Sequence, residues 1–186
     1  MDSQLFNIKN NLLQEAEYCR SPHYNLRPAG YDIELIVIHN ISLPPSHFNN
    51  SYVEHFFMGK LNPNDHPYFK TIQHLKVSSH IFIRRDGSVI QFVPFDKRAW
   101  HAGISSYKGK ESCNDFSIGI ELEGVDDIPY EKEQYTSLIK LTNALIKEYP
   151  LLNKSAIVGH SEIAPNRKTD PGKAFDWNLY LSMLRN

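Results

Sequence analysis

Near the C-terminus the chain reads Gly159-His160-Ser161-Glu162-Ile163-Ala164-Pro165-Asn166-Arg167-Lys168-Thr169-Asp170-Pro171-Gly172, directly after the apolar run Ala156-Ile157-Val158. The apolar run predicts the end of a buried strand. Because proline lacks an N–H group and fixes φ, the two prolines and the final Pro-Gly predict a rigid loop rather than a helix or a central strand. We therefore expect His160 at the exit of a strand. Residues two apart share a face in extended backbone, so we expect Lys168 beside Asp170.

This loop has two interpretations. An imidazole, a carboxylate and an ammonium group on a stiff loop suit a metal site with an adjacent group that stabilises an oxyanion. Clustered charges mark functional sites only in some proteins, and the same residues also suit an ordinary solvated turn. A metal site requires at least one further ligand from another part of the chain.

A second histidine follows a core strand. The run Ile33-Glu34-Leu35-Ile36-Val37-Ile38-His39 is rich in β-branched residues and continuously apolar at its centre, which is typical of a central strand buried on both faces. Pro44 and Pro45 prevent it from continuing. Open α/β sheets place their sites at strand ends, so His39 is a candidate ligand.

Two glutamates share one face of another predicted strand, which reads Ser117-Ile118-Gly119-Ile120-Glu121-Leu122-Glu123-Gly124. Charged side chains are almost never fully buried unless they are paired. Either both glutamates face solvent at a sheet edge, or at least one points into a polar cleft. In a cleft, Glu121 or Glu123 is a candidate general base, and the pattern alone does not choose between them.

The remaining elements fit an α/β fold. Residues 79–94 form two β-rich runs around Asp86-Gly87, the signature of a tight hairpin. An amphipathic pattern predicts a helix over residues 130–149, and Asp176 is a plausible N-cap for a helix over residues 177–185. Residues 46–78 read as a long insertion with a short helix near residues 51–58; it forms either a pocket wall or a surface loop with packed aromatic residues.

Composition excludes several classes of protein. The chain has 186 residues, 41% hydrophobic and 22% charged, with a formal net charge of −1. This length favours one domain. The net charge gives no indication that the chain binds nucleic acid or an anionic membrane. Cys19 and Cys113 form no recognisable disulfide or metal motif. Residues 1–20 contain acidic residues and no apolar core of a signal peptide, and no apolar run reaches transmembrane length, so we expect a cytoplasmic protein.

Together these elements offer a set of zinc ligands. His39, His160 and Asp170 come from strand ends or the rigid loop, and catalytic zinc sites commonly have three such ligands and one open position. Zinc lowers the pKa of its water to about 7 and polarises a carbonyl group. A glutamate of the core strand is available as a base, and Lys168 as an oxyanion stabiliser. The set is complete for amide hydrolysis, although nine histidines allow many other trios.

The chain resembles the AmpD-type 1,6-anhydro-N-acetylmuramyl-L-alanine amidases, which belong to a zinc amidase superfamily shared with peptidoglycan recognition proteins and some phage lysozyme-amidases. Matching segments occur in order from residue 21 to about 177. They are 39–45 (HNISLPP), 66–69 (HPYF), 77–80 (VSSH), 83–87 (IRRDG), 93–103 (VPFDKRAWHAG), 114–124 (NDFSIGIELEG) and 167–172 (RKTDPG).

The resemblance implies a single zinc amidase domain over residues 1–186, with its catalytic core at about 21–177 and a mixed β-sheet flanked by helices. It implies one Zn2+ per chain, Glu121 rather than Glu123 as the catalytic glutamate, and Lys168 as the oxyanion stabiliser. The implied zinc ligands are His39, His160 and Asp170, and the implied substrate-binding residues are Asn40, Lys76, Trp100 and His101. Lys76 and Ser112 stand where relatives often carry arginine, and lysine does not grip a carboxylate in the same bidentate manner.

The implied reaction is cleavage of the amide between the lactyl group of anhydro-N-acetylmuramic acid and L-alanine, in cytoplasmic peptidoglycan recycling. The implied partner is the anhydro-muropeptide substrate, with no nucleic acid, membrane or obligate protein partner. Three alternatives remain: a peptidoglycan-binding module without catalysis, an amidase that acts on intact cell wall, and a zinc-independent structural protein with a histidine-rich surface.

Overall fold

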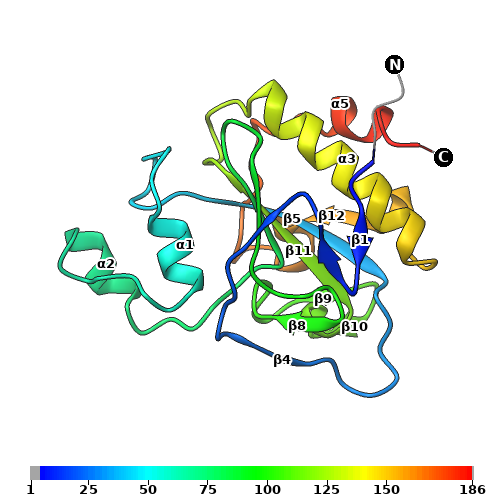
Figure 1. Ribbon diagram of the computed structural model, residues 1–186, viewed down its shortest axis with the longest axis horizontal. Helices are drawn as coiled ribbons and strands as arrows, with labels where there is room; N and C mark the ends of the chain where they lie inside the picture. The colour runs from blue at the N-terminus through cyan, green and yellow to red at the C-terminus, as the bar shows by residue number, and fades with distance from the viewer. Residues whose placement is uncertain (1–4, 186) are drawn as a thin grey trace.

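A six-stranded sheet forms the centre of the computed structural model, which describes residues 5–185 (Figure 1). Its strands lie in the order β12-β5-β11-β6-β7-β3. Their bounds are β3 Glu17–Tyr18, β5 Leu35–Ile41, β6 Ile81–Ile83, β7 Val89–Gln91, β11 Ser117–Glu123 and β12 Ile157–Gly159. Strands β12, β5, β11 and β6 run parallel, whereas β6 and β7 are antiparallel, so the sheet is mixed as the sequence predicted.

One face of the sheet packs against the long helix α3 (Lys132–Glu148) and the C-terminal helix α5 (Trp177–Ser182). The side chains that the strands direct to this face are aliphatic, because alternate residues of a strand point to the same side. They are Ile36 and Ile38 of β5, Ile81 and Ile83 of β6, and Ile118, Ile120 and Leu122 of β11, which join Leu138, Leu141 and Leu145 of α3 in one buried cluster.

The opposite face is covered by smaller elements and includes the polar residues. Helices α1 (Tyr52–Phe57) and α2 (Pro67–Ile72) project from one side of the molecule (Figure 1), and their aromatic residues pack with Phe82 of β6. Leu35 and Val37 of β5 pack with Phe116 and with Ile163 of α4 (His160–Ile163). His39 lies two residues after Val37 in β5, and Glu121 lies four residues after Ser117 in β11. Because residues an even number apart point to the same side of a strand, His39 and Glu121 both point to this second face.

Short pairs of strands surround the main sheet. Strand β1 (Ile8–Lys9) pairs with β2 (Leu12–Leu13), and β9 (Ser106–Tyr107) with β10 (Lys110–Glu111). Strand β4 (Tyr24–Leu26) pairs with β8 (Lys97–Ala99). Two 3-10 turns, Cys113–Asp115 and Lys154–Ala156, precede β11 and β12.

The predicted hairpin and long helix are confirmed, and the final helix is confirmed but ends at Ser182 rather than at residue 185. Gly87 has φ of 81° in the turn between β6 and β7, a conformation that glycine adopts without strain. Asp176 caps α5 by accepting a hydrogen bond from the backbone N–H of Leu179 at 2.9 Å. Helix α1 lies where the short helix of the insertion was expected, but α2 and the short strands before residue 30 were not predicted.

The expectation that the whole of residues 159–172 is a loop is wrong at its beginning. Residues 160–163 form α4, a single helical turn. The first proline is Pro165, which lies beyond this turn and therefore does not prevent it, and Glu162 accepts a hydrogen bond from the backbone N–H of Gly159 at 2.8 Å. Cys19 and Cys113 are free, and no helix in residues 5–185 has the length and apolar character to cross a bilayer.

Candidate metal centre and catalytic cleft

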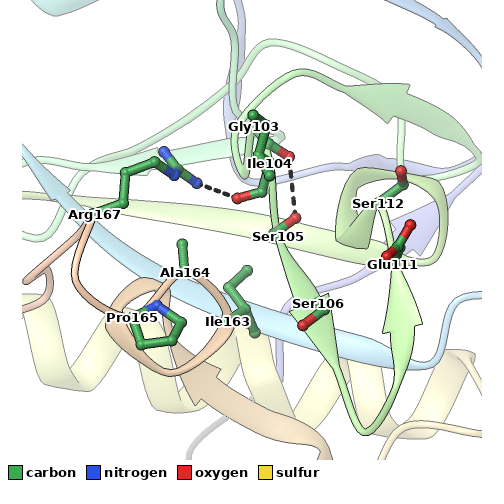
Figure 2. Close-up of a pocket in the computed structure, with 10 residues that line it drawn as sticks. All are labelled: Gly103, Ile104, Ser105, Ser106, Glu111, Ser112, Ile163, Ala164, Pro165 and Arg167. Carbon is green, nitrogen blue, oxygen red and sulfur yellow. Dashed lines mark hydrogen bonds between the residues drawn. The ribbon is translucent and has the colours of Figure 1, made fainter.

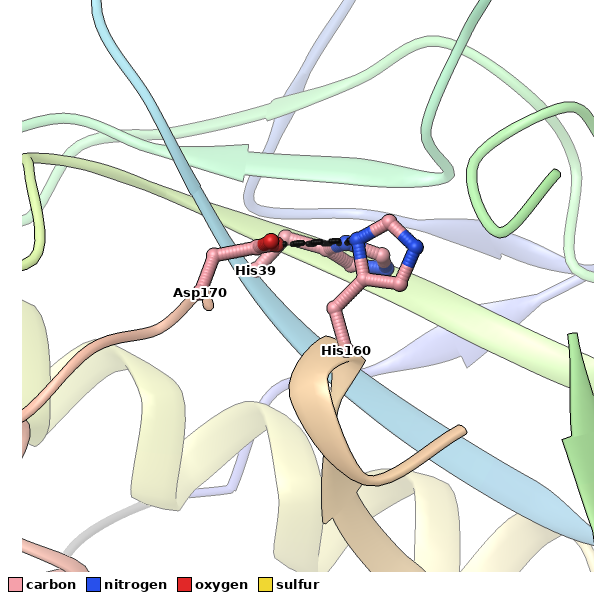
Figure 3. Close-up of side chains that lie close together, drawn as sticks. All are labelled: His39, His160 and Asp170. Carbon is pink, nitrogen blue, oxygen red and sulfur yellow. Dashed lines mark hydrogen bonds and ion pairs between the residues drawn. The ribbon is translucent and has the colours of Figure 1, made fainter. Parts of the chain in front are cut away.

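His39, His160 and Asp170 meet at one point on the polar face of the sheet (Figure 3). Nδ1 of His39 lies 2.9 Å from Nδ1 of His160 and 3.1 Å from Oδ2 of Asp170. Nδ1 of His160 lies 3.0 Å from the same carboxylate oxygen. Three potential ligand atoms from distant parts of the chain therefore form a compact group.

The sheet topology explains why these residues meet. His39 lies in β5, and His160 directly follows β12, which pairs with β5 in parallel, so both histidines lie toward the same ends of adjacent strands. The loop that carries Asp170 is tied to the start of α4, because Ser161 donates its backbone N–H to the carbonyl oxygen of Asp170 at 3.0 Å. The predicted convergence at strand ends follows from this parallel pairing.

The donor set of this group fits zinc. Nε2 of His160 lies 3.1 Å from the carbonyl oxygen of Ala102, and a carbonyl group can only accept a hydrogen bond. Nε2 therefore carries the proton, and Nδ1 presents a lone pair toward His39 and Asp170. Two buried imidazoles and a carboxylate are a usual set of protein ligands for a zinc ion with one open position.

Burial and mutual contact set the protonation of these residues. Burial lowers the pKa of His39 to about 4, although its close contact with the carboxylate of Asp170 acts in the opposite direction. Burial raises the pKa of Asp170, but the close contacts with the imidazoles of His160 and His39 outweigh it and hold this pKa well below its usual range. A neutral histidine and an ionised carboxylate are the forms that bind a metal ion.

Glu121 is a buried carboxylate without a hydrogen-bonding partner for its Oε2 atom in the described residues. It lies in β11 opposite His39 of β5 in the parallel register. Burial and the negative charge of Asp170 raise its pKa well above the ordinary carboxyl value, whereas the positive charge of Lys168 lowers it. An unpaired carboxylate beside a candidate metal site is a candidate proton acceptor.

Glu123, two residues along the same strand, has a different environment. One of its carboxylate oxygens accepts the backbone N–H of Asn49 at 2.6 Å, and the other accepts the backbone N–H of Arg85 at 3.0 Å. Its side chain is buried and fully engaged in joining loops to the sheet. Both glutamates therefore lie inside the molecule, and neither is at a solvent-facing sheet edge.

A cleft of about 530 Å³ is lined by Asp170, one of the three candidate ligands. Asn40, Lys168 and Asp170 line it on one side, and Tyr68 and Leu75 line it from the insertion that contains α2. The insertion therefore forms a wall of this cleft, as one of the two interpretations of the sequence predicted. Asp170 is directed toward the histidines and forms no ion pair with Lys168 within residues 5–185, so the expected pairing of Lys168 with Asp170 is not found there.

Comparison with known proteins identifies the family. Residues 29–173 match the N-acetylmuramoyl-L-alanine amidase family Amidase_2. The chain belongs to this family. It is 56% identical over 170 residues to the 1,6-anhydro-N-acetylmuramyl-L-alanine amidase AmpD of Escherichia coli strain K12, with 91% of this chain and 92% of that protein covered. The predicted class of enzyme, an amidase that hydrolyses a C–N bond, is thereby confirmed.

Solved structures agree with this assignment. A crystal structure of an AmpD selenomethionine derivative has a TM-score of 0.94 and 52% identity, and covers 96% of this chain and 99% of that one. The amidase AmiD of Escherichia coli, in complex with anhydro-N-acetylmuramic acid-L-Ala-D-gamma-Glu-L-Lys, has a TM-score of 0.59 and 30% identity, and covers 84% of this chain and 59% of that one. The mixed α/β fold predicted for this amidase is confirmed.

The four predicted substrate-binding residues of the amidase lie in different environments. Asn40 lines the cleft and donates its amide to Asp126 Oδ1 at 2.9 Å. Lys76 is exposed in the loop after α2, and is not among the cleft-lining residues. Trp100 donates its indole N–H to Asn25 at 2.7 Å, and its ring stacks on His23.

His101, the fourth of them, is joined to the metal centre rather than to the cleft wall. Its Nδ1 lies 2.9 Å from Nε2 of His39, and its Nε2 lies 3.1 Å from Oγ of Ser117. Both ring nitrogens of His101 are therefore engaged inside the protein.

The sequence did not predict a role for Arg167 or the presence of a second cavity. Arg167 lines both the cleft and an adjacent cavity of about 550 Å³, which Figure 2 shows between the loop at Gly103 and the end of α4. Its guanidinium donates to the carbonyl oxygens of Ala102 and Ile104, each at 2.6 Å. Ser112, where relatives often carry arginine, lines the same cavity. The position of Arg167, directly before Lys168, is the sequence signal that could have identified it.

Proposed function

We propose that this chain is a single-domain, zinc-dependent amidase that cleaves the amide between the lactyl group of 1,6-anhydro-N-acetylmuramic acid and L-alanine in muropeptides. The observation that carries the proposal is the convergence of His39, His160 and Asp170 beside the unpartnered carboxylate of Glu121. The substrate class is taken from the name of the AmpD relative and from the ligand of the AmiD complex. We further propose that the enzyme acts in cytoplasmic peptidoglycan recycling on soluble fragments, with no nucleic acid, membrane or obligate protein partner.

His39, His160 and Asp170 would hold one zinc ion per chain through two Nδ1 atoms and one carboxylate oxygen. When bound there, zinc supplies Lewis acidity toward a carbonyl group and toward water. The short side-chain distances within the group favour this proposal, because neutral histidines and an ionised aspartate bring three lone pairs together. A cation offsets the repulsion among such lone pairs.

Glu121 is the proposed general base and acid. It accepts a proton from the attacking water as the water oxygen bonds to the carbonyl carbon of the lactyl group. When the C–N bond breaks, Glu121 returns that proton to the nitrogen of L-alanine, so the carboxylate is regenerated. Burial raises the pKa of Glu121 from the ordinary carboxyl value, which is the direction that favours acceptance of a proton from water.

Lys168 is the proposed oxyanion stabiliser. Its ammonium group belongs to the cleft wall, and its charge acts on both Glu121 and His39. A fixed positive charge at this place stabilises the negative charge that develops on the carbonyl oxygen during attack. Asn40, held by Asp126, and the apolar wall of Tyr68 and Leu75 are placed to contact the sugar and the peptide.

The test is hydrolysis of anhydro-muramyl-tripeptide by the purified chain, with and without a chelator, together with a zinc assay. We expect release of the tripeptide, about one zinc per chain and loss of turnover with the chelator. Tight binding without cleavage would instead indicate a recognition module. Cleavage of intact sacculi at a rate that exceeds cleavage of the soluble fragment would indicate an amidase of intact cell wall.

A further inference from the structure

His101 lies between the metal centre and the interior of the sheet. Its ring meets the ring of His39 edge-on, with centroids 5.0 Å apart and planes at 86°, and Nδ1 of His101 is 2.9 Å from Nε2 of His39. On its far side, Nε2 of His101 is 3.1 Å from Oγ of Ser117. A continuous chain of hydrogen bonds therefore connects Ser117, through His101, to the candidate ligand His39.

Ser117, at the inner end of this series of hydrogen bonds, determines which atom donates in each of them. Ser117 Oγ lies 2.5 Å from the carbonyl oxygen of Cys113, and that oxygen can only accept, so the hydroxyl proton of Ser117 points to Cys113. Oγ then has only lone pairs to offer His101, so Nε2 of His101 carries a proton. In a neutral imidazole the other nitrogen is an acceptor, so Nδ1 of His101 accepts from Nε2–H of His39. Nδ1 of His39 is left with a lone pair, directed at His160 and Asp170.

The fold leaves a defined space for the imidazole ring of His101. A Cβ atom at Gly119 of β11 would lie 2.4 Å from Cγ of His101, so only glycine leaves room for the ring. Glycine weakens a strand interior and often marks a close approach of another group. The side-chain oxygen of Asn114 accepts the backbone N–H groups of His101 and Ala102, at 3.1 and 2.8 Å. The backbone and the ring of His101 are therefore both held in place.

We propose that His101 is a positioning residue for the metal, and that it holds His39 in the Nε2–H tautomer so that Nδ1 is available as a ligand. Ser117 is the anchor that fixes the direction of the chain, and Gly119 provides the space. The inference rests on the proposed zinc site, and it gives His101 a role that differs from the substrate contact implied by sequence resemblance. Partners that orient a metal-binding histidine typically contribute a factor of about 10–100 in metal affinity.

The test compares two variants of similar shape, His101→Asn and His101→Leu. The Oδ1 atom of asparagine occupies the place of Nδ1 and can accept from His39, whereas leucine places a methyl group there. We expect the zinc dissociation constant, measured by chelator competition, to stay within about threefold of wild type for His101→Asn. For His101→Leu we expect it to rise by about 10–100-fold. Equal zinc affinity in the two variants, whether high or low, would overturn the proposal, because the acceptor would then be irrelevant.

A second readout follows the tautomer itself. In metal-free protein at pH 8, the ¹⁵N chemical shifts of the His39 ring are expected to report Nε2–H in wild type and His101→Asn, and loss of that preference in His101→Leu. A wild-type His39 in the Nδ1–H form would overturn the inference without reference to zinc. The wild-type zinc titration separates the two proposals: absence of zinc binding refutes the proposed metal site, whereas wild-type affinity in His101→Leu refutes only the role of His101. A raised KM of His101→Leu at unchanged zinc affinity would instead indicate that His101 contacts the substrate.

Discussion

Glu121 and Glu123 provide the sharpest test of how this site is built, because they are two residues apart on one strand and differ in their partners. Glu121 is 8% exposed and Glu123 is 2% exposed, so both carboxylates are removed from water. Glu123 accepts two backbone N–H groups, whereas Oε2 of Glu121 has no partner among the described residues. The same substitution, glutamate to glutamine, is therefore expected to act in opposite directions at the two positions.

We expect Glu121→Gln to increase the free energy of unfolding of the metal-free protein. A buried polar group without a partner costs about 1–3 kcal/mol, and more when it is charged. A neutral amide reduces this cost without removing it, so a gain of about 1 kcal/mol is expected, which corresponds to about 2–4 °C in Tm for a domain of this size. Glu123→Gln is expected to lower the free energy of unfolding by about 1–3 kcal/mol, because the backbone N–H of Asn49 or of Arg85 then faces an amide NH2 group.

The stability gain of Glu121→Gln should depend on pH. Burial and the charge of Asp170 raise the pKa of Glu121 in the folded protein above the ordinary value that it has in the unfolded chain. Between these two values the folded state binds more protons than the unfolded state, so this group lowers stability progressively as pH rises. The difference between Glu121→Gln and wild type should therefore be small near pH 4 and reach its full size above the raised pKa.

The assays are urea unfolding of chelator-treated proteins at several pH values, and turnover of the zinc-loaded proteins. We expect Glu121→Gln to retain one zinc and to lose a factor of about 10²–10⁴ in kcat, as for loss of a general base. Glu123→Gln should retain most of its turnover at temperatures where it is folded. The reasoning is refuted if Glu121→Gln is no more stable than wild type at pH 8, or if Glu123→Gln is the variant that loses turnover.

Three further substitutions test the centre and its loop. Asp170→Ala should lose zinc and activity together, because it removes one of three ligands, and a full zinc content in this variant would contradict the ligand assignment. Lys168→Met should keep its zinc but lose a factor of about 10²–10³ in kcat; an unchanged kcat would exclude it as the oxyanion stabiliser. Gly172→Ala should unfold at a lower temperature than Gly30→Ala, since both glycines have φ near 80° but only at Gly172 would a Cβ meet another residue, 2.2 Å from Cα of Asp126. Equal melting temperatures would show that this close approach relaxes without cost.

Much of the fold could be predicted because local patterns and tertiary structure agree. The apolar core of β5, the Asp86-Gly87 turn and the apolar stripe of α3 each specify an element without reference to the rest of the chain. The short strands β1 to β4 could not be found in this way. Strands β3 and β4 pair with strands far along the chain, β7 and β8, and in all four strands a run of two or three residues carries no measurable period.

The candidate site could be predicted in part for a similar reason. Histidines at strand exits and an aspartate on a proline-rich loop are local signals, and parallel pairing of β12 with β5 brings them together. The choice between Glu121 and Glu123 required the register of β11 and the positions of two distant N–H groups, which no local pattern contains. His101 is an intermediate case: a glycine inside a strand, such as Gly119, is a local signal for the close approach of another group, but it does not identify that group.

The alternation of β11 itself indicates which of its residues serves chemistry. Its even-numbered residues, Ile118, Ile120 and Leu122, pack under α3, while Ser117, Gly119, Glu121 and Glu123 point to the other face, which is also buried. A polar face in the centre of a sheet is stable only when its groups find partners. Ser117 has Cys113 and His101, Gly119 gives room to His101, and Glu123 has two N–H donors. Among these four residues, Glu121 alone keeps a carboxylate oxygen without a partner in the described part of the chain, and its place beside three candidate metal ligands supports the proposal that its partner arrives with the reaction.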